Sequence, residues 1–198
     1  MGVRIRVFED VARFAKATDD LGRRQIPFAL ARALTMTARD AQTDVRSDLP
    51  RRFTIRTPRV PKGIRITPAT KAKPEAIIGS IDWFMKDQEI GGTRRGKCHR
   101  IAVPVNVRRT KRDIVAKSMR PTPLRDKPKV FMVRTANGAG IIRRQGRERY
   151  PVEVMYWLKR DVRITPAMGF KGTTSATVAK RFGPNFVHAL SDAMGHTG

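Results

Sequence analysis

The stretch from Gln25 to Leu49 constrains the fold more than any other part of this chain. Apolar residues recur along it at the spacing of one helix face, namely Ile26, Leu30, Leu34, Ala38, Ala41, Val45 and Leu49. Gly22 marks a break before it, and Pro27 falls in the expected first turn, where proline costs no hydrogen bond. Because proline cannot continue a helix, Pro50 is expected to end it. The pattern predicts a long helix with one apolar face.

The same helix carries two lines of charge. At about 100° per residue, three arginines and three aspartates fall on opposite flanks of the apolar stripe: Arg32, Arg39 and Arg46 on one, Asp40, Asp44 and Asp48 on the other. One interpretation is a solvated helix of mixed charge. The other is that one flank meets the opposite flank of a neighbouring copy in a ring, which makes these six residues a subunit interface.

Shorter patterns predict the rest of the chain. Residues 3–8 alternate as a strand does, and residues 9–20 have the pattern of a short helix. Short alternating runs separated by prolines follow Pro50, and "KVFMVRT" with "IIRR" predicts a hairpin that turns at Asn137-Gly138. The end is helical, with a stripe at Val178, Phe182, Phe186, Leu190 and Met194. Gly183-Pro184 is expected to kink this helix or divide it in two.

This order of elements predicts an α+β fold, in which an antiparallel β-sheet or small barrel is packed by N-terminal helices and a kinked C-terminal helix. At 198 residues the chain is most simply a single domain, 1–198. Within it, "GGTRRGKCHR" has the composition of a glycine-rich basic loop, and residues 108–128 that of a linker with one helical turn. We therefore expect a basic loop or arm excursion at about 85–128.

The net charge of +25 limits the possible partners. Residues 51–149 hold 27 Lys and Arg against seven Asp and Glu, so this central part carries nearly all of the excess. A surface of this kind indicates contact with nucleic acid or with an acidic protein. No membrane contact is expected, since the chain has no signal peptide, no spanning apolar run and no basic amphipathic helix.

Glycine-flanked and loop arginines can reach phosphate oxygens, which give affinity without sequence reading. The candidate contacts to nucleic acid or an acidic partner are Arg94, Arg95, Lys97, Arg100, Arg108, Arg109, Lys111, Arg112, Arg143, Arg144, Arg147 and Arg149. Stacking on single strands is expected to be weak, because Trp83, Tyr150, Tyr156 and Trp157 are mostly interpreted as buried. Nonspecific contact with duplex DNA and packing against acidic proteins both remain open.

No arrangement of residues in the sequence points to catalysis. The single cysteine, Cys98, lacks zinc-ligand spacing, and the three histidines are scattered. The carboxylates Glu75, Asp82, Asp87 and Glu89 have no supporting lysine or histidine constellation and are interpreted as moderating a basic surface. We expect no enzyme, no catalytic residue, no metal and no cofactor.

Two segments near the C-terminus resemble a known family. "GRERYPVEV", followed by "RITPAM" and a terminal helix broken at "RFGPNFVHAL", resembles the minor tail protein Z, or tail completion, family of lambda-like phages. The matching residues are Arg149, Tyr150, Pro151, Val152, Glu153 and Val154, with Pro184 inside the helix. "IPFALARALTMTARDAQTDVRSDL" looks like the early helix of that family, and "RRFTIRTPRV" like its arginine-rich exit. The resemblance covers both ends, while the middle agrees only in composition.

The resemblance implies a structural virion protein at the head-tail junction, assembled in the host cytoplasm. It implies a homo-oligomeric ring, most simply a hexamer, between the tail terminator and the neck or connector proteins, close to the path of duplex DNA. Such a ring completes the tail and enables head-tail joining. Two alternatives stay open: a tail terminator or head-tail connector subunit, and a stand-alone nonspecific nucleic-acid-binding protein.

Overall fold

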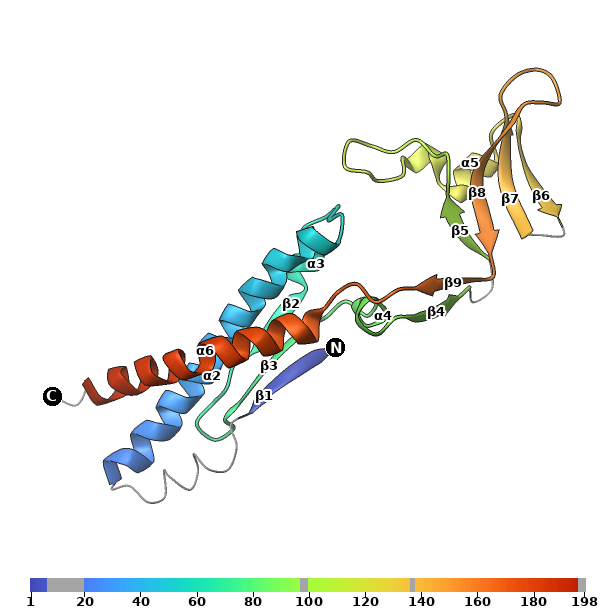
Figure 1. Ribbon diagram of the computed structural model, residues 1–198. Helices are drawn as coiled ribbons and strands as arrows, with labels where there is room; N and C mark the ends of the chain where they lie inside the picture. The colour runs from blue at the N-terminus through green and yellow to red at the C-terminus, as the bar shows by residue number, and fades with distance from the viewer. Residues whose placement is uncertain (7–19, 97–99, 136–137, 196–198) are drawn as a thin grey trace. The chain divides into compact units, whose positions relative to one another are not determined.

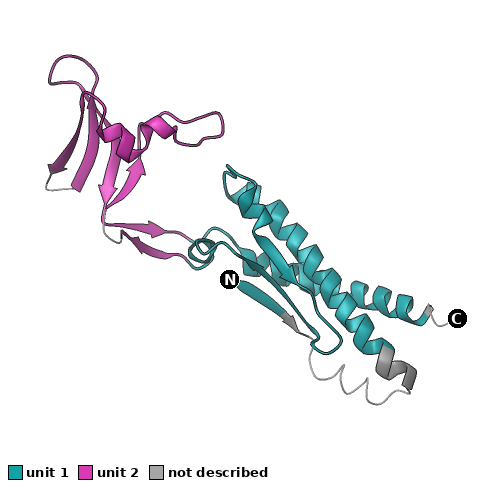
Figure 2. Ribbon diagram, turned by 180° about the vertical axis from the view of Figure 1, so that it is seen from behind, with its two compact units in different colours: residues 1–90, 166–198 teal, residues 91–165 magenta. Residues whose placement is uncertain are grey.

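The computed structural model describes residues 1–6, 20–96, 100–135 and 138–195. By their contacts the residues form two compact units, shown in Figure 2. Unit 1 comprises residues 1–90 and 166–198, and unit 2 comprises residues 91–165. Unit 2 is therefore inserted into unit 1, and it begins within the segment expected as an excursion but continues beyond residue 128. The fold is α+β, as predicted, with several antiparallel sheets.

Unit 1 is built on two long helices that lie side by side, α2 (Asp20–Arg52) and α6 (Phe170–Gly195) (Figure 1). An antiparallel sheet in the order β1-β3-β2 packs on α2. Its strands are β1 (Gly2–Arg6), β2 (Ile64–Thr67) and β3 (Glu75–Ser80). Two short helices, α3 (Arg59–Lys62) and α4 (Met85–Ile90), complete the unit. The helix expected at residues 9–20 lies almost wholly outside the described residues.

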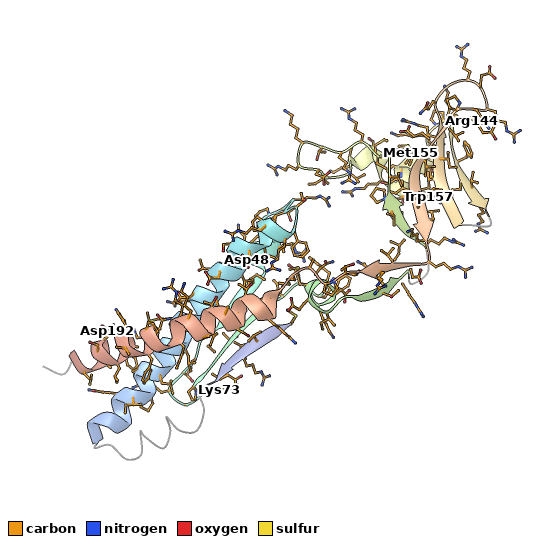
Figure 3. The ribbon with its side chains drawn as sticks, viewed as in Figure 1. Asp48, Lys73, Arg144, Met155, Trp157 and Asp192 are labelled. Carbon is orange, nitrogen blue, oxygen red and sulfur yellow. The ribbon has the colours of Figure 1, made fainter. Side chains whose placement is uncertain are left out.

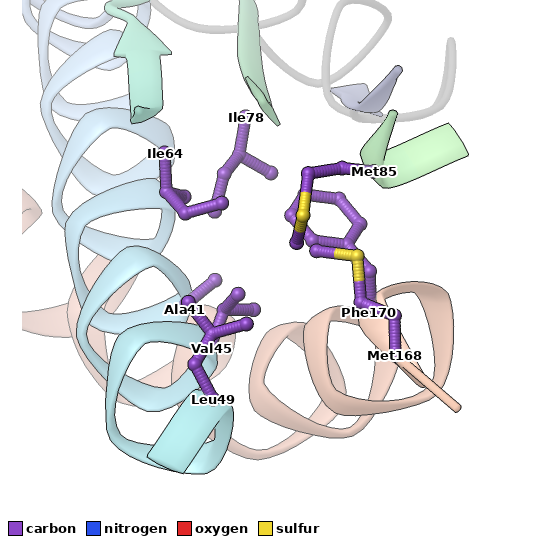
Figure 4. Close-up of a cluster of buried hydrophobic side chains, with 8 residues drawn as sticks. All are labelled: Ala41, Val45, Leu49, Ile64, Ile78, Met85, Met168 and Phe170. Atoms are coloured by element: carbon purple, nitrogen blue, oxygen red, sulfur yellow. The ribbon is translucent and has the colours of Figure 1, made fainter. Parts of the chain in front are cut away.

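The predicted apolar stripe of α2 is confirmed. All seven of its residues are buried, from Ile26 to Leu49. The C-terminal half of the stripe joins Ile64 and Ile78 of the sheet, together with Met85, Met168 and Phe170, in one core cluster (Figure 4). The N-terminal half packs against Ala76 and the half-buried side chains of α6. The helical spacing of apolar residues predicted the buried face correctly, because one face of α2 packs against both the sheet and α6.

The predicted limits of this helix are wrong at both ends. The helix begins at Asp20, so Gly22 lies within it and Pro27 is about two turns inside. Ile26 and Ala29, on either side of Pro27, are buried. Their packing offsets the backbone hydrogen bond that the proline cannot donate. At the other end, the N–H of Phe53 donates to the carbonyl of Leu49 (2.9 Å), so the helical pattern continues past Pro50.

Helix α6 is continuous through Pro184, so of the two expected outcomes, a kink or a division into two helices, the division is wrong. Val178, Phe182, Phe186 and Leu190 of its predicted stripe pack against α2, whereas the fifth residue, Met194, is 56 % exposed. Phe182 and Phe186 are only half-buried and stack on each other at 6.1 Å. The fully buried residues of α6 include Thr174 and Ala189. Small residues at this interface, among them Ala29, Ala33 and Ala189, let the two helices approach closely.

Unit 2 contains an open four-stranded antiparallel sheet in the order β5-β8-β7-β6. Its strands are β5 (Ile101–Pro104), β6 (Val130–Thr135), β7 (Gly138–Arg144) and β8 (Val152–Lys159). The pairing of β6 with β7 confirms the predicted hairpin. The predicted position of its turn is wrong for Gly138, which is the first residue of β7 and pairs with Thr135. No sheet of the described residues closes into a barrel, so of the two predicted forms the structure has the open one.

A second, two-stranded sheet of unit 2 pairs β4 (Gly92–Arg95) with β9 (Asp161–Ile164). The prediction of a glycine-rich basic loop is wrong for Gly92–Arg95, because these residues form β4 and pair with β9, which lies far away in the sequence. Residues 108–128 hold η1 (Lys117–Met119) and α5 (Pro121–Arg125), and Met119 and Leu124 are buried in the core of unit 2. The second half of this segment is therefore part of unit 2 and not a free arm.

Candidate anion-binding surface

Positive charge is concentrated on unit 2. Residues 91–165 contain 21 Lys and Arg but only five Asp and Glu, so they contribute +16 of the chain's +25. Unit 1, although larger, contributes the remaining +9. A unit with this imbalance attracts polyanions and repels a second cationic surface.

The loop between β7 and β8 carries the densest group of candidate contacts. Arg144, the last residue of β7, is exposed at the start of this loop, and Arg147 and Arg149 are exposed within it; these three are called the loop arginines below. Figure 3 labels Arg144. The Arg144 guanidinium lies 5.2 Å from the ring centre of Phe131, and that of Arg149 lies 5.9 Å from the ring of Tyr150. The N–H of Gln145 donates to the carbonyl of Pro151 (3.1 Å) and closes the loop. The loop thus presents three guanidinium groups to solvent.

Arg143 has a different environment from its three neighbours. Its Nη2 donates to Oε2 of Glu153 at 2.8 Å, and the two residues are paired across β7 and β8. The carboxylate of Glu153 is about one-fifth exposed, so this ion pair is partly shielded from solvent. Arg143 therefore has a structural partner, whereas the loop arginines hold no ion pair with the described residues.

The loop before η1 presents a second group of cations. Arg109 binds both carboxylate oxygens of Asp113, at 2.9 and 3.1 Å. The backbone N–H of Thr110 donates to the carbonyl of Ile114 (2.8 Å), and the N–H of Ile114 donates to the Thr110 hydroxyl (3.3 Å), so the loop is closed. Arg108, Lys111 and Arg112 remain exposed on it. The structure thus places three of these four candidates where a phosphate or carboxylate can reach them.

The remaining candidates of unit 2 lie on or beside β4 and β5. Arg94 and Arg95 are exposed on β4, and Arg100 donates to the carbonyl of Leu158 at 3.4 Å. Lys97 and Cys98 lie outside the described residues. The candidate cations are therefore spread over several loops and strands of unit 2 and do not form one compact site.

The acidic flank of α2 faces α6 of the same chain. Asn185 donates to Asp40 (2.9 Å), the hydroxyl of Thr177 to Asp44 (2.7 Å), and the hydroxyl of Thr173 to Asp48 (2.9 Å). Figure 3 labels Asp48 on α2. The three aspartates, spaced four residues apart, thus bind a matching row of polar side chains. Thr173 and Thr177 have the same four-residue spacing as Asp44 and Asp48, but no local pattern shows that the two pairs meet.

Two arginines of the basic flank also have partners within the chain. Arg32 pairs with Asp192 of α6 at 2.7 Å, and Arg46 donates to the carbonyls of Pro61 and Ile64. Arg39 is exposed and forms no ion pair with the described residues. That these two flanks also form a subunit interface stays a prediction.

Three of the four carboxylates that the sequence suggested moderate a basic surface make contacts within unit 1. Asp82 is only 3 % exposed and pairs with Arg59 at 3.3 Å, while Glu75 pairs with Arg4 at 3.5 Å. Glu89 accepts hydrogen bonds from the first backbone N–H groups of α6. The interpretation that they moderate a basic surface is wrong for Asp82 and Glu89. In the described part of the chain, no group of three His, Cys, Asp or Glu residues could hold a metal ion.

The aromatic side chains are more exposed than expected. Trp83 and Tyr150 are each 67 % exposed and Trp157 is 42 % exposed, so the prediction that most are buried is wrong for three of the four. The fourth, Tyr156, is buried and its hydroxyl donates to the carbonyl of Met119 (2.8 Å). Burial raises the pKa of Tyr156 above its usual 10.0, with a smaller opposing effect of Arg109 and Arg120.

Comparisons of the chain with protein-family models, with curated proteins and with solved structures give no match. Among the described residues, no helix combines the length and apolar character needed to cross a membrane.

Proposed function

We propose that the protein is a structural, non-enzymatic subunit of a phage virion, a tail completion protein at the head-proximal end of the tail. The observation that supports this best is that the core-bearing helix pair and most of the positive charge lie in different units. Unit 1 has its own cores and helix pair, while the inserted unit 2 carries +16 with exposed arginines on its loops. A subunit of this kind can be held in an assembly by one unit and offer a cationic surface with the other.

The cationic surface suits contact with duplex DNA that passes the head-tail junction. Loop guanidinium groups such as those of Arg144, Arg147 and Arg149 bind phosphate oxygens without reading bases. Contact of this kind retains DNA of any sequence, which a tail must do. Acidic neighbours in the neck are the other chemistry that this surface fits.

In this proposal the protein forms a homo-oligomeric ring, most simply a hexamer, between the tail terminator and the neck or connector proteins. Assembly takes place in the host cytoplasm, and the product is part of the virion. The resemblance of the segment from Arg149 to Val154 to tail completion proteins supports this position, and β8 begins within that segment. No catalytic group or cofactor takes part.

The test is particle fractionation with an epitope-tagged chain. We expect the tag to co-sediment with purified tails at both low and high salt, and gold-labelled antibody to mark the head-proximal end. Deletion of the gene should give tails of normal length and filled heads that do not join. Release of the protein by high salt would favour a stand-alone nucleic-acid-binding protein, and tails of abnormal length would favour a terminator.

A further inference from the structure

One face of the sheet of unit 2 contains a hollow of about 420 Å³. The strand register places Ala102, Leu158, Ala139 and Arg134 in one row across β5, β8, β7 and β6, and Met132 beside Ile141 in the next. All six line the hollow, and Pro121 and Thr122 of α5 form its wall. The alanines on both sides of Leu158 leave the space that larger side chains would fill. A volume of this size is within the ordinary range of binding pockets, roughly 300–1,000 Å³.

Three arginines surround this hollow. Arg100 lies before β5, Arg125 ends α5 and Arg134 lies on β6. All three line the hollow, and none of its described lining residues is acidic. Arg134 makes no hydrogen bond or ion pair with the described residues, and the nearest contact of Arg125 with a carboxylate is 3.9 Å, to Asp126. With the described residues, Arg100 forms one long hydrogen bond, of 3.4 Å, to the carbonyl of Leu158. Their donors are therefore largely available to an anionic ligand.

The side chains at the bottom of the hollow, here called its floor, distinguish two possible anionic ligands: a nucleic acid and an acidic protein segment. The side chains of the floor are aliphatic or sulfur-containing, among them Met132, Ile141 and Leu158, and none of the described residues that line the hollow carries an aromatic ring. A nucleic acid would place phosphates against the arginines but would find no ring on which to stack its bases. An acidic protein segment can fill the floor with an apolar side chain while its carboxylates bind the guanidinium groups.

We propose that this hollow is a docking site for an acidic segment of a partner protein, anchored by one or two apolar side chains. The inference rests on the proposed function, since it gives the chemistry of a neighbour in the assembly. It separates two roles within unit 2: the hollow binds protein, and the arginine loop between β7 and β8 binds DNA. An acidic patch without apolar side chains does not fit, because the floor would stay unfilled.

The experiment uses the full-length protein and three fluorescein-labelled probes. The first is a short peptide in which glutamates flank a leucine and a phenylalanine, the second has serines in place of these two, and the third is a short DNA duplex. We expect the first peptide to bind more tightly than the serine peptide by about tenfold, as a buried apolar anchor would give. Fluorescence anisotropy titrations measure all three affinities.

Two variants alter the hollow. The double variant Arg125→Gln and Arg134→Gln removes two charges from its rim, and Ala102→Leu fills it; each should weaken the first peptide about tenfold or more. The matched control is the loop variant, with Arg144→Gln, Arg147→Gln and Arg149→Gln, which should weaken DNA binding and leave the peptide unchanged. Thermal unfolding checks that each variant is folded. Arg125 and Arg134 are exposed, so the arginine double variant should fold even if Ala102→Leu does not.

Three outcomes would overturn the proposal. Equal binding of the two peptides would mean attraction by charge alone, and unchanged peptide binding by the folded hollow variants would place the site elsewhere. Loss of DNA binding by the hollow variants, as large as that of the loop variant, would make nucleic acid the occupant. None of these results depends on particle fractionation, so this inference and the proposed function can fail separately.

Discussion

The side chain of Glu89 binds the start of α6, since its Oε2 accepts a hydrogen bond of 2.7 Å from the backbone N–H of Phe170. Oε1 of the same carboxylate accepts a second, of 3.0 Å, from the N–H of Lys171. Beside it, the carbonyl of Gln88 accepts from the N–H groups of Ala167 and Met168. The chain leaves unit 1 just after Glu89 and returns just before Ala167. These bonds therefore close unit 1 at the point where unit 2 is inserted.

Replacing Glu89 with alanine should destabilise unit 1 by about 1–2 kcal/mol, because α6 loses its capping carboxylate and a negative charge near its N-terminus. Urea unfolding followed by circular dichroism measures the change. Asp87→Ala in the same short helix is the control, since Asp87 has no ion pair or hydrogen bond among the described residues and should cost less than about 0.5 kcal/mol. Equal effects of the two changes would show that the contact with α6 contributes nothing.

Unit 1 should fold without unit 2. Residues 91–165 can be replaced by a short glycine-serine linker, because the bonds from Gln88 and Glu89 already hold the two ends together. The core clusters of the helix pair and of the three-stranded sheet lie entirely in unit 1. We expect a helical, cooperatively unfolding protein that no longer binds DNA. An unfolded product would mean that the units stabilise each other, and retained DNA binding would move the anion-binding surface to unit 1.

An aspartate on the buried stripe of α2 should prevent folding. Leu34 is fully buried and Val45 nearly so, and Leu34→Asp or Val45→Asp would bury a charge without a partner at a cost of several kcal/mol. Phe28→Asp is the control on the same helix, since Phe28 is 43 % exposed. Soluble expression and thermal unfolding distinguish them. If Leu34→Asp unfolds at the wild-type temperature, the buried face of α2 has been assigned incorrectly.

What the sequence predicted well depends on local periodicity. The apolar stripe of α2 and the hairpin of β6 and β7 each depend on residues that are close in the sequence, so the local sequence pattern was enough to predict them. The pairing of β4 with β9 joins residues more than sixty positions apart, and no local pattern records it. The same limit explains Gly92–Arg95, whose composition is that of a loop and whose strand exists only because Asp161–Ile164 lies beside it.

The contacts of charged residues were also beyond local reasoning. Helical spacing correctly placed Asp40, Asp44 and Asp48 on one line, but only the fold shows that Thr173 and Thr177 of α6 meet that line. The four arginines at 143–149 look equivalent in sequence. Strand register separates them, because it puts Arg143 opposite Glu153 and leaves the other three beyond the paired ladder or at its end.

Tyr156 gives a test of the core of unit 2 at alkaline pH. Tyr156→Phe should cost about 1–2 kcal/mol below pH 10, because the carbonyl of Met119 loses a buried donor. Burial raises the pKa of Tyr156 in the folded protein above its unfolded value of 10.0. The wild-type advantage is therefore complete below pH 10 and shrinks as pH rises above it, since the unfolded chain then releases a proton that the folded chain holds. A difference that stays constant above pH 10 would argue against the buried environment.

The last prediction concerns the arginine loop and separates DNA contact from folding. Each phosphate contact contributes about 0.9 to the slope of log affinity against log salt, so the variant with Arg144→Gln, Arg147→Gln and Arg149→Gln should flatten this slope by up to about three. Its thermal unfolding should stay close to wild type, because these arginines have no ion pair with the described residues. The proposed function predicts that phage with this variant has tails of normal length that join heads poorly or retain DNA insecurely.

Arg143→Gln is the matched control within the same cluster. Its guanidinium is paired with Glu153, so we expect a loss of stability of about 0.5–1 kcal/mol and little change in the salt slope. Glu153→Gln should cost a similar amount, and the double variant should cost less than the sum because both changes remove one interaction. If Arg143→Gln flattens the slope as much as one loop arginine does, the ion pair opens when DNA binds. An unchanged slope in the triple variant, with normal infectivity, would make the loop a solvated surface and leave DNA contact to the cations at 94–112.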